Sequence, residues 1–375
     1  MISIEDNQSV ADYDYPLDPA LIAGSPPPER DQSQLLIYHR DSGQMEHRSF
    51  TSLPKYLKPH DLLVLNDTRV FPARLTAEKG SGGRLELLFL RPLLHQVEQE
   101  KGIFSQCWEV LAKGKGRETT DLFFKGKILG RFLKDLGGGR HEVVIHRPAD
   151  QYSDVYTFLE RWGEIPLPPY ILKRRKMEGS NLSESLCRAE EAEDRERYQT
   201  VYARRWGSAA APTAGLHFTD PLLNTLREKG IQTATITLHI GLDTFQPMRS
   251  EKIRDHEMHR EWYQVSEETA SQINTTRERG GRVIAVGTTV TRVLETVTRP
   301  GGRIQAGEGE TDLFITPGYR FKGTDALITN FHLPKSTLLV LLSAFAGKDV
   351  IRSVYREAIA RRYRFYSYGD AMFVV

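Results

Sequence analysis

The sequence contains little cysteine and no long hydrophobic run. Its two cysteines, Cys107 and Cys187, lie far apart, outside any CxxC motif and away from the histidine spacings of zinc sites. A disulfide framework or a zinc site is therefore not expected, and a reducing compartment fits the composition. The longest apolar stretch, residues 338–346, is about half of the roughly 20 residues that a transmembrane helix needs. This stretch is typical of a buried helix, and no membrane association is expected.

An excess of either charge is also missing. Lysine and arginine number 51 against 49 aspartate and glutamate, which gives a formal net charge of +2. This balance gives no overall sign of nucleic-acid binding, although it is compatible with a local basic surface. The acidic first residues lack the basic start and apolar core of a signal peptide, and 39% hydrophobic residues are typical of a globular chain. We expect a soluble cytoplasmic protein.

The length favours two domains, because 375 residues exceed what one hydrophobic core usually serves. Residues 71–147 hold short β-rich runs separated by glycine-rich turns, which predicts a small β-barrel. Residues 1–70 and 148–375 show α/β patterns on either side of it. We therefore predict an α/β protein with an irregular α/β main domain, discontinuous in sequence, into which the β-barrel domain is inserted.

Polar residues follow a predicted buried strand in the first part of the chain. Residues 61–65 form a continuous apolar run, and Asn66, Asp67, Thr68 and Arg69 come directly after it. In open α/β sheets, ligands bind outside the carboxyl ends of the strands, so these four residues are candidates for substrate binding. A simple polar turn is the alternative interpretation.

Several elements are predicted in the second half of the chain. Residues 173–197 are the most hydrophilic segment and are expected to be a solvated loop, with polyanion binding by residues 173–176 as the alternative. Asp220 and Pro221 are placed at the N-cap and first position of a helix. Residues 233–240 alternate in polarity, which predicts a strand whose polar face carries His239. Another strand is expected at residues 312–316, and a helix from about Ser336.

Two histidine-bearing segments are candidates for catalysis. His217 lies in residues 211–218, and His239 precedes Asp243 in residues 239–245. Histidine titrates near neutrality, so it accepts or donates protons at cellular pH, and a nearby carboxylate fixes its tautomer. The chain has no GxSxG elbow, which disfavours a serine hydrolase. A third segment, residues 255–261, has two histidines three apart but no HExxH motif, so helix capping or pairing with arginine is favoured over a metal site.

A strand–glycine–helix pattern adds a candidate binding loop. Gly287, Thr288 and Thr289 follow the predicted strand 282–286 and open a helix whose free N–H groups favour an anionic or polar ligand. The signal is weak by itself, because both the GxGxxG and the GxxxxGK[ST] motifs are missing. Aromatic residues adjoin the candidate loops; each is by default a core residue, and stacking on a flat base is the alternative.

Taken in order along the chain, these segments resemble one family closely, the S-adenosylmethionine:tRNA ribosyltransferase-isomerases of queuosine biosynthesis. The resemblance covers the whole length, in many ordered blocks. The blocks are residues 14–17 (DYPL), 28–31 (PERD), 65–70 (LNDTRV), 211–218 (APTAGLHF), 239–245 (HIGLDTF), 259–263 (HREWY), 286–289 (VGTT), 311–321, 329–339 and 366–372 (YSYGDAM).

The resemblance implies an activity that spacing alone does not show. Members of this family transfer and isomerise the ribosyl part of S-adenosylmethionine onto 7-aminomethyl-7-deazaguanine (preQ1) at the wobble position of a tRNA with a GUN anticodon. The products are epoxyqueuosine in tRNA, adenine and methionine. The resemblance also implies an irregular α/β domain with an inserted barrel, and S-adenosylmethionine acts as a co-substrate with no metal or redox cofactor. A monomer is expected, because the chain shows no heptads or repeats.

The implied chemistry needs a base for a C5′ proton beside the sulfonium and an acid for the leaving adenine. We assign His217 and His239 to these transfers, with Asp243 orienting or sharing them. Asn66, Asp67, Thr68 and Arg69 are expected to hold polar groups of the substrate, and Phe218, Phe245 and Phe331 to sandwich a base. Further substrate-binding residues are expected at Thr213, Gly215, Gly241, Thr244, Thr288, Thr289 and His332.

Two other functions fit the residues less well. One is a nucleoside-cleaving transferase or hydrolase that acts without RNA. The other is a non-catalytic RNA-binding module, which has no need of convergent histidine and aspartate side chains. Binding of tRNA requires a basic surface because phosphate contacts dominate affinity. Candidates for it are residues 361–364, residues 174–175 and the predicted β-barrel.

Overall fold

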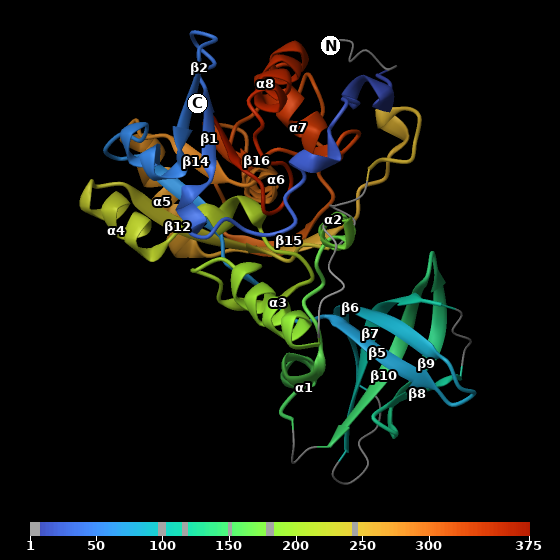
Figure 1. Ribbon diagram of the computed structural model, residues 1–375. Coiled ribbons are helices and arrows are strands. Elements are labelled where there is room, and N and C mark those ends of the chain that lie inside the picture. Colours follow the sequence, from blue (N-terminus) through green and yellow to red (C-terminus); the bar gives the residue numbers. More distant parts are fainter. Residues whose placement is uncertain (1–7, 97–102, 115–118, 149–151, 178–183, 242–246) are drawn as a thin grey trace.

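A nine-stranded mixed sheet forms the core of the larger part of the molecule (Figure 1). The computed structural model describes residues 8–96, 103–114, 119–148, 152–177, 184–241 and 247–375. In spatial order the strands are β15 (Gly307–Thr311), β13 (Glu261–Val265), β12 (Gln232–Leu238), β3 (Leu62–Asn66), β14 (Val283–Val286), β16 (Ala326–Asn330), β17 (Ala371–Val374), β1 (Gln34–Tyr38) and β2 (Met45–Ser49). Strands β12, β3, β14 and β16 run parallel. Their carboxyl ends therefore meet at one side of the sheet, here called the carboxyl edge.

Both faces of this sheet are covered, and the predicted apolar strand is confirmed at its centre. Every residue of β3 is buried, as expected of a parallel strand packed on both sides. Leu63 and Leu65 join a hydrophobic cluster with helix α4 (Asp220–Glu228). Leu62 and Val64 join the opposite cluster, to which helices α5 (Glu267–Glu278), α6 (Thr288–Val297), α7 (Thr337–Ala346) and α8 (Lys348–Ala360) contribute.

Capping side chains set where the helices begin. The Ser336 hydroxyl accepts the Leu339 N–H, so α7 starts where the sequence predicts. For α4 the prediction is wrong by one residue. Thr219 is the N-cap, because its hydroxyl accepts the Leu222 N–H, and Asp220 and Pro221 become the first two helical residues.

Six antiparallel strands close into a separate β-barrel, which confirms the predicted fold class (Figure 1). They are β5 (Arg74–Lys79), β6 (Arg84–Gln96), β7 (Ile103–Lys113), β8 (Asp121–Phe124), β9 (Lys127–Gly137) and β10 (Arg140–Pro148). Trp108 and Phe89 fill the barrel with fully buried rings. Helix α1 (Val155–Trp162) also packs into this hydrophobic cluster through Val155 and Leu159. The domain limits at residues 71 and 147 stay a prediction.

The hydrophilic segment 173–197 is helical where the structure describes it, so the prediction of a solvated loop is wrong. Helix α2 (Pro169–Met177) and helix α3 (Glu184–Arg197) are joined by ion pairs that the loop prediction left out. Arg175 forms a two-pronged pair with buried Asp194, at 2.7 and 2.8 Å. A bidentate ion pair of this kind stabilises the packing of two hydrophilic helices, and the composition of the segment does not predict it. Figure 1 shows α1 and α3 between the large sheet and the barrel, and Arg195 donates to the Glu160 carbonyl there.

The strand expected at residues 312–316 is also wrong, because the strand lies earlier, at β15. The carbonyl groups of Thr311 and Leu313 accept hydrogen bonds from the guanidinium of buried Arg292 in α6. Within residues 312–316, the carbonyl of Leu313 is therefore bonded to a side chain and not to a neighbouring strand.

Two short strands and several 3₁₀ turns complete the described chain. Strands β4 (Thr68–Val70) and β11 (Arg205–Ser208) pair in parallel. The turns are η1 (Val10–Tyr13), η2 (Pro19–Leu21), η3 (Arg30–Gln32), η4 (Phe50–Lys55), η5 (Thr213–His217) and η7 (Ile253–Asp255). Within the described segments, none of the helices combines the length and apolarity that crossing a bilayer requires.

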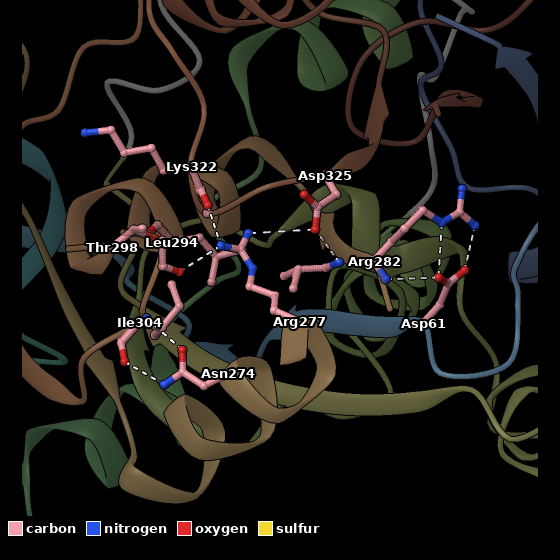
Figure 2. Close-up of polar contacts among 12 residues, drawn as sticks. Asp61, Asn274, Arg277, Arg282, Leu294, Thr298, Ile304, Lys322 and Asp325 are labelled. Atoms are coloured by element: carbon pink, nitrogen blue, oxygen red, sulfur yellow. Dashed lines mark hydrogen bonds and ion pairs between the residues drawn. The ribbon is translucent and has the colours of Figure 1, made fainter. Parts of the chain in front are cut away.

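A polar network stabilises the amino ends of the parallel strands, opposite the carboxyl edge (Figure 2). The Arg282 guanidinium donates from Nε and Nη2 to the Asp61 carboxylate, at 3.1 and 2.6 Å. Asp325 accepts the Val283 N–H, and Asn274 exchanges two hydrogen bonds with the backbone of Ile304. Asp61 is only 1% exposed, so removal of its charge would leave Arg282 without its partner.

Replacing Asp61 with Asn is expected to lower the free energy of unfolding by about 3 kcal/mol, because it leaves Arg282 without its buried counter-charge. Urea unfolding followed by circular dichroism measures this. Asp325→Asn is the matched control, since its carboxylate is partly exposed and its salt bridge to Arg277 is long, at 3.7 Å. It should cost less than about 1 kcal/mol. Equal losses for the two variants would contradict the assignment.

Candidate functional site

A cavity lies at the carboxyl edge, where the sequence analysis places the candidate residues. It encloses about 520 Å³, part of it open to solvent. Its walls come from four segments that are far apart in sequence, from one residue each of helices α2 and α7, and from Ile240 after β12. We call it the carboxyl-edge cavity. Its lining residues are Tyr170, Ala211, Pro212, Thr213, Ala214, Ile240, Gly287, Thr288, Thr289, Thr329, Asn330, Phe331, His332, Leu333, Leu338, Tyr366 and Ser367. Five of the predicted binding residues meet here: Thr213, Thr288, Thr289, Phe331 and His332.

The turn between β14 and α6 forms one wall of the cavity. Gly287 adopts φ +100°, a backbone conformation that suits glycine, and lets the chain turn directly from strand into helix. No side chain caps this helix, and the first N–H with an intrahelical partner is that of Thr291, which donates to the Gly287 carbonyl. The N–H groups of Thr288 and Thr289 therefore start α6 without helical acceptors, on residues that are buried.

Tyr170 and Tyr366 form an aromatic wall that the sequence analysis missed. Their ring centroids are 4.7 Å apart, and both rings line the cavity. Tyr366 has φ +73°, a strained value for a residue with a side chain, and such strain concentrates at functional sites. The signal available in the sequence was the block at residues 366–372, which matches the family but had no assigned role.

His217 is held from both sides by protein groups. Its Nδ1 lies 2.8 Å from the Ser33 hydroxyl and its Nε2 lies 3.1 Å from Asn330 Nδ2. Because an amide NH₂ only donates, Nε2 is the acceptor and Nδ1 carries the proton. Burial, with the charges of Arg364 and Arg30, lowers the pKa of His217 to about 3, so the ring is neutral. His217 lines a separate cavity of about 240 Å³, with Arg30 and Arg197, rather than the carboxyl-edge cavity.

His239 differs from His217 in keeping one ring nitrogen available. Its Nδ1 lies 2.9 Å from the Thr68 hydroxyl, and its ring stacks on Trp262 with centroids 5.0 Å apart. Among the described residues Nε2 has no hydrogen-bond partner, and Gly207 leaves space beside it, since a Cβ there would lie 2.5 Å away. Burial and Arg205 lower the pKa of His239 to about 4. The next residue, Ile240, lines the carboxyl-edge cavity.

The side chains of Asn66 and Asp67 connect the end of β3 to β12 through hydrogen bonds. Asn66 Oδ1 accepts the N–H groups of Leu238 and Thr68, and its Nδ2 donates to the Leu238 carbonyl. Asp67 accepts from the Thr237 hydroxyl at 2.6 Å. Both side chains therefore set the end of β12, from which His239 follows, and Thr68 contacts that histidine directly.

Arg69 points away from this network. Its guanidinium stacks over the Trp206 ring at 3.9 Å from the centroid, and it lies 4.0 Å from Glu160. The side chain is 41% exposed, which suits a contact with a large polyanionic substrate rather than a buried one.

Two of the three predicted stacking rings are part of the core. Phe218 is fully buried and meets Phe50 edge-on at 5.1 Å. Phe331 is fully buried among Tyr355 and Phe365, although its backbone borders the cavity. Phe245 lies outside the described residues, as do Asp243 and Thr244.

Gly215 and Gly241, both predicted to bind substrate, each have a structural role in the fold. A Cβ at Gly215 would lie 2.1 Å from the Tyr202 hydroxyl, so this position requires glycine for packing. Gly241 donates its N–H to the Glu261 carboxylate at 3.2 Å. Glu261 forms a buried ion pair with Arg292, so it pairs with an arginine, as the sequence analysis favours.

His332 lies on the cavity wall. Its Nε2 is 2.8 Å from the Thr329 hydroxyl, and burial lowers its pKa to about 3. Its backbone is fixed on both sides, since its N–H donates to Tyr355 and its carbonyl accepts from Tyr15. Neutral histidine and threonine hydroxyls therefore give the cavity a polar lining without a carboxylate.

Comparisons with known proteins agree with this arrangement. A family model described as queuosine biosynthesis protein matches residues 10–374. A relative from Symbiobacterium thermophilum, named S-adenosylmethionine:tRNA ribosyltransferase-isomerase, is 48% identical over 371 residues, 98% of this chain and 99% of its own. A relative of the same name from Halothermothrix orenii is 47% identical over 374 residues, again 98% and 99%. The crystal structure of an S-adenosylmethionine tRNA ribosyltransferase from Thermotoga maritima is similar with a TM-score of 0.52 and 35% identity, and covers 97% of this chain and 100% of that one.

Proposed function

The chain belongs to the queuosine biosynthesis family of S-adenosylmethionine:tRNA ribosyltransferase-isomerases, and on this premise we propose that the carboxyl-edge cavity binds its S-adenosylmethionine. The protein is a tRNA-modifying transferase that takes its ribosyl group from this co-substrate. One observation supports the cavity most. The segments 211–214, 287–289, 329–333 and 366–367 line it together, and each lies within a block that resembles the family.

The finer details of the reaction are part of this proposal. The acceptor is preQ1 at the wobble position of a tRNA with a GUN anticodon, and the products are epoxyqueuosine, adenine and methionine. The sulfonium of the co-substrate acidifies the C5′ protons and supplies the leaving group, so no metal or redox cofactor takes part. The enzyme acts as a cytoplasmic monomer.

His239 is proposed to carry the proton in the chemical steps. Its Nε2 has no partner among the described residues, and the pKa of about 4 keeps the imidazole neutral at neutral pH. Such a ring holds a proton only transiently, and once protonated it is a strong acid toward a leaving group. The Thr68 hydroxyl, which both donates and accepts hydrogen bonds, holds Nδ1 in place, and Asp243 is the proposed partner of His239. His217 has both nitrogens occupied, so it is proposed to position the wall around Asn330 instead of exchanging protons with substrate.

Incubation with S-adenosylmethionine and a preQ1-containing tRNA tests the proposed function. Adenine and methionine should appear together with an anticodon nucleotide of higher mass, as seen by chromatography and mass spectrometry. A tRNA with guanine at the wobble position is the matched control and should give no product. Adenine release at the same rate without RNA would contradict the proposal.

The affinity for tRNA is expected to fall steeply with salt, because phosphate contacts release counterions. The proposed contacts are Arg69 on Trp206 and the exposed Arg361 and Arg362. Arg175 is committed to Asp194, and Arg364 lies beside buried Asp370. Filter binding between 50 and 200 mM KCl measures the slope. Replacing Arg69 with Gln should reduce that slope by about 1, as expected for one lost phosphate contact. An unchanged slope would exclude Arg69 from the interface.

A further inference from the structure

Helix α6 begins at the carboxyl-edge cavity, and among the described residues its first N–H groups have no hydrogen-bond acceptor. Thr288 and Thr289, at 5% and 6% exposure, line the cavity at this helix end. The helix has ten residues, and its N-terminus has partial positive charge that attracts an anionic oxygen. Within the described lining there is no aspartate or glutamate that would compete for these N–H groups or repel an anion.

Asn330 supplies a second and independent sign of a ligand. It is 2% exposed and lines the same cavity. Its Nδ2 lies near His217 Nε2, at 3.1 Å, and near the carbonyl groups of Tyr366 and Asp370, at 3.3 and 3.5 Å. Because those carbonyls only accept, the orientation of the amide is fixed. Asn330 Oδ1 is then buried with no hydrogen-bond partner in the part of the chain that the structure describes, a state that native structures avoid unless a ligand or water completes it.

The N-terminus of α6 and Asn330 Oδ1 favour different chemical groups on a bound ligand. The start of α6 favours an anionic oxygen, and Asn330 Oδ1 needs an N–H donor. An α-amino acid carries both, a carboxylate and an ammonium on the same carbon. S-adenosylmethionine has this pair at its methionyl end, whereas a tRNA phosphate offers the anion without the donor.

We infer that the carboxyl-edge cavity holds the methionyl end of S-adenosylmethionine, with its carboxylate on the N–H groups of Thr288 and Thr289 and its ammonium on Asn330 Oδ1. This inference rests on the proposed function, which makes the cavity the co-substrate site. Beyond the proposed function, the inference specifies the orientation of the co-substrate in the cavity. It also gives Asn330 a double role, since the same amide holds His217 and contacts the ligand.

Calorimetric titration of the full-length protein with modified co-substrates tests this orientation without any catalysis. Decarboxylated S-adenosylmethionine lacks only the carboxylate, and a deaminated analogue lacks only the ammonium. Each should bind the wild-type protein at least about tenfold more weakly than S-adenosylmethionine, as expected for one lost charge-assisted hydrogen bond. Inorganic phosphate at millimolar concentration should not displace S-adenosylmethionine. Equal affinities for all three adenosyl compounds, or displacement by phosphate, would overturn the orientation.

Asn330→Ala locates the ammonium contact. The variant should bind S-adenosylmethionine about tenfold more weakly, yet bind the deaminated analogue as the wild type does. An equal loss for both compounds would indicate a general disturbance of the wall through His217 and would count against the inference. Asn274→Ala is the matched control, since it deletes an asparagine amide at the opposite edge of the sheet (Figure 2) and should leave both affinities unchanged.

The titrations and the tRNA assay separate the two claims. Weaker binding of the decarboxylated analogue by a protein that modifies tRNA supports both. Equal binding by a protein that still modifies tRNA overturns the orientation alone. If S-adenosylmethionine does not bind and no adenine is released with preQ1-containing tRNA, the proposed function itself fails. If Asn330→Ala does not fold, the analogue titrations on the wild-type protein still decide the outcome.

Discussion

Replacing His239 with Gln is expected to lower kcat for adenine release by roughly 10²- to 10⁴-fold, the usual contribution of a positioned acid or base. Glutamine keeps a polar group near Thr68 but has no titratable nitrogen to replace Nε2. The affinity for S-adenosylmethionine should change little, because the proposed role of His239, next to the lining residue Ile240, is proton transfer and not binding. Single-turnover release of labelled adenine, followed at saturating substrates, measures the effect.

The pH dependence of the same reaction gives a second measurement. Because burial lowers the pKa of His239 to about 4, its neutral form predominates down to about pH 5 in the free enzyme. Consequently kcat/KM should not show a step near pH 6.5, where an exposed histidine titrates. His256→Gln is the matched control, since that imidazole packs edge-on against Phe314 and does not line the carboxyl-edge cavity, so kcat should stay unchanged. Normal turnover by His239→Gln would remove His239 from the mechanism.

Acid is expected to destabilise the protein strongly between pH 6.5 and 5. Burial lowers the pKa of both His217 and His332 to about 3, against about 6.5 in the unfolded chain. Below pH 6.5 the unfolded state therefore binds protons that the folded state does not, and stability falls as the pH falls, until about pH 3. Each histidine contributes a loss of about 2 kcal/mol by pH 5, or about 4 kcal/mol together.

Urea unfolding at pH 7 and pH 5 measures this loss. His239, whose pKa is lowered to about 4, adds to the loss in both proteins. His332→Gln removes only the contribution of His332, so its loss between these values should be about 2 kcal/mol smaller than that of the wild type. The variant is compared with the wild type because other buried groups also change the stability over this range. Burial raises the pKa of Asp370 and Glu164, and these carboxyl groups stabilise the folded protein as the pH falls. His39→Gln is the control, since His39 is partly exposed beside Glu46. Equal losses for wild type and His332→Gln would show that His332 is not the acid-sensitive group.

The sequence predicted the elements whose signals are local. The buried run of β3, the helix start at Ser336 and the turn at Gly287 all depend on residues close together in the chain, and all three are confirmed. The segment 173–197 was misjudged because its helices are joined by a pairing over 19 residues, between Arg175 and Asp194, which composition does not show.

The family and the reaction follow from the sequence, because ordered blocks along the whole chain match the family regardless of how they are placed in space. The roles of the two histidines do not follow from it. Ser33 is 184 positions from His217, Asn330 is 113 positions from it, and Thr68 is 171 positions from His239. Only the folded sheet brings these partners together, and a hydrogen bond is decided by distances of a few ångströms. The tertiary structure therefore decides which imidazole nitrogen is free, and with it which histidine is suited to move a proton.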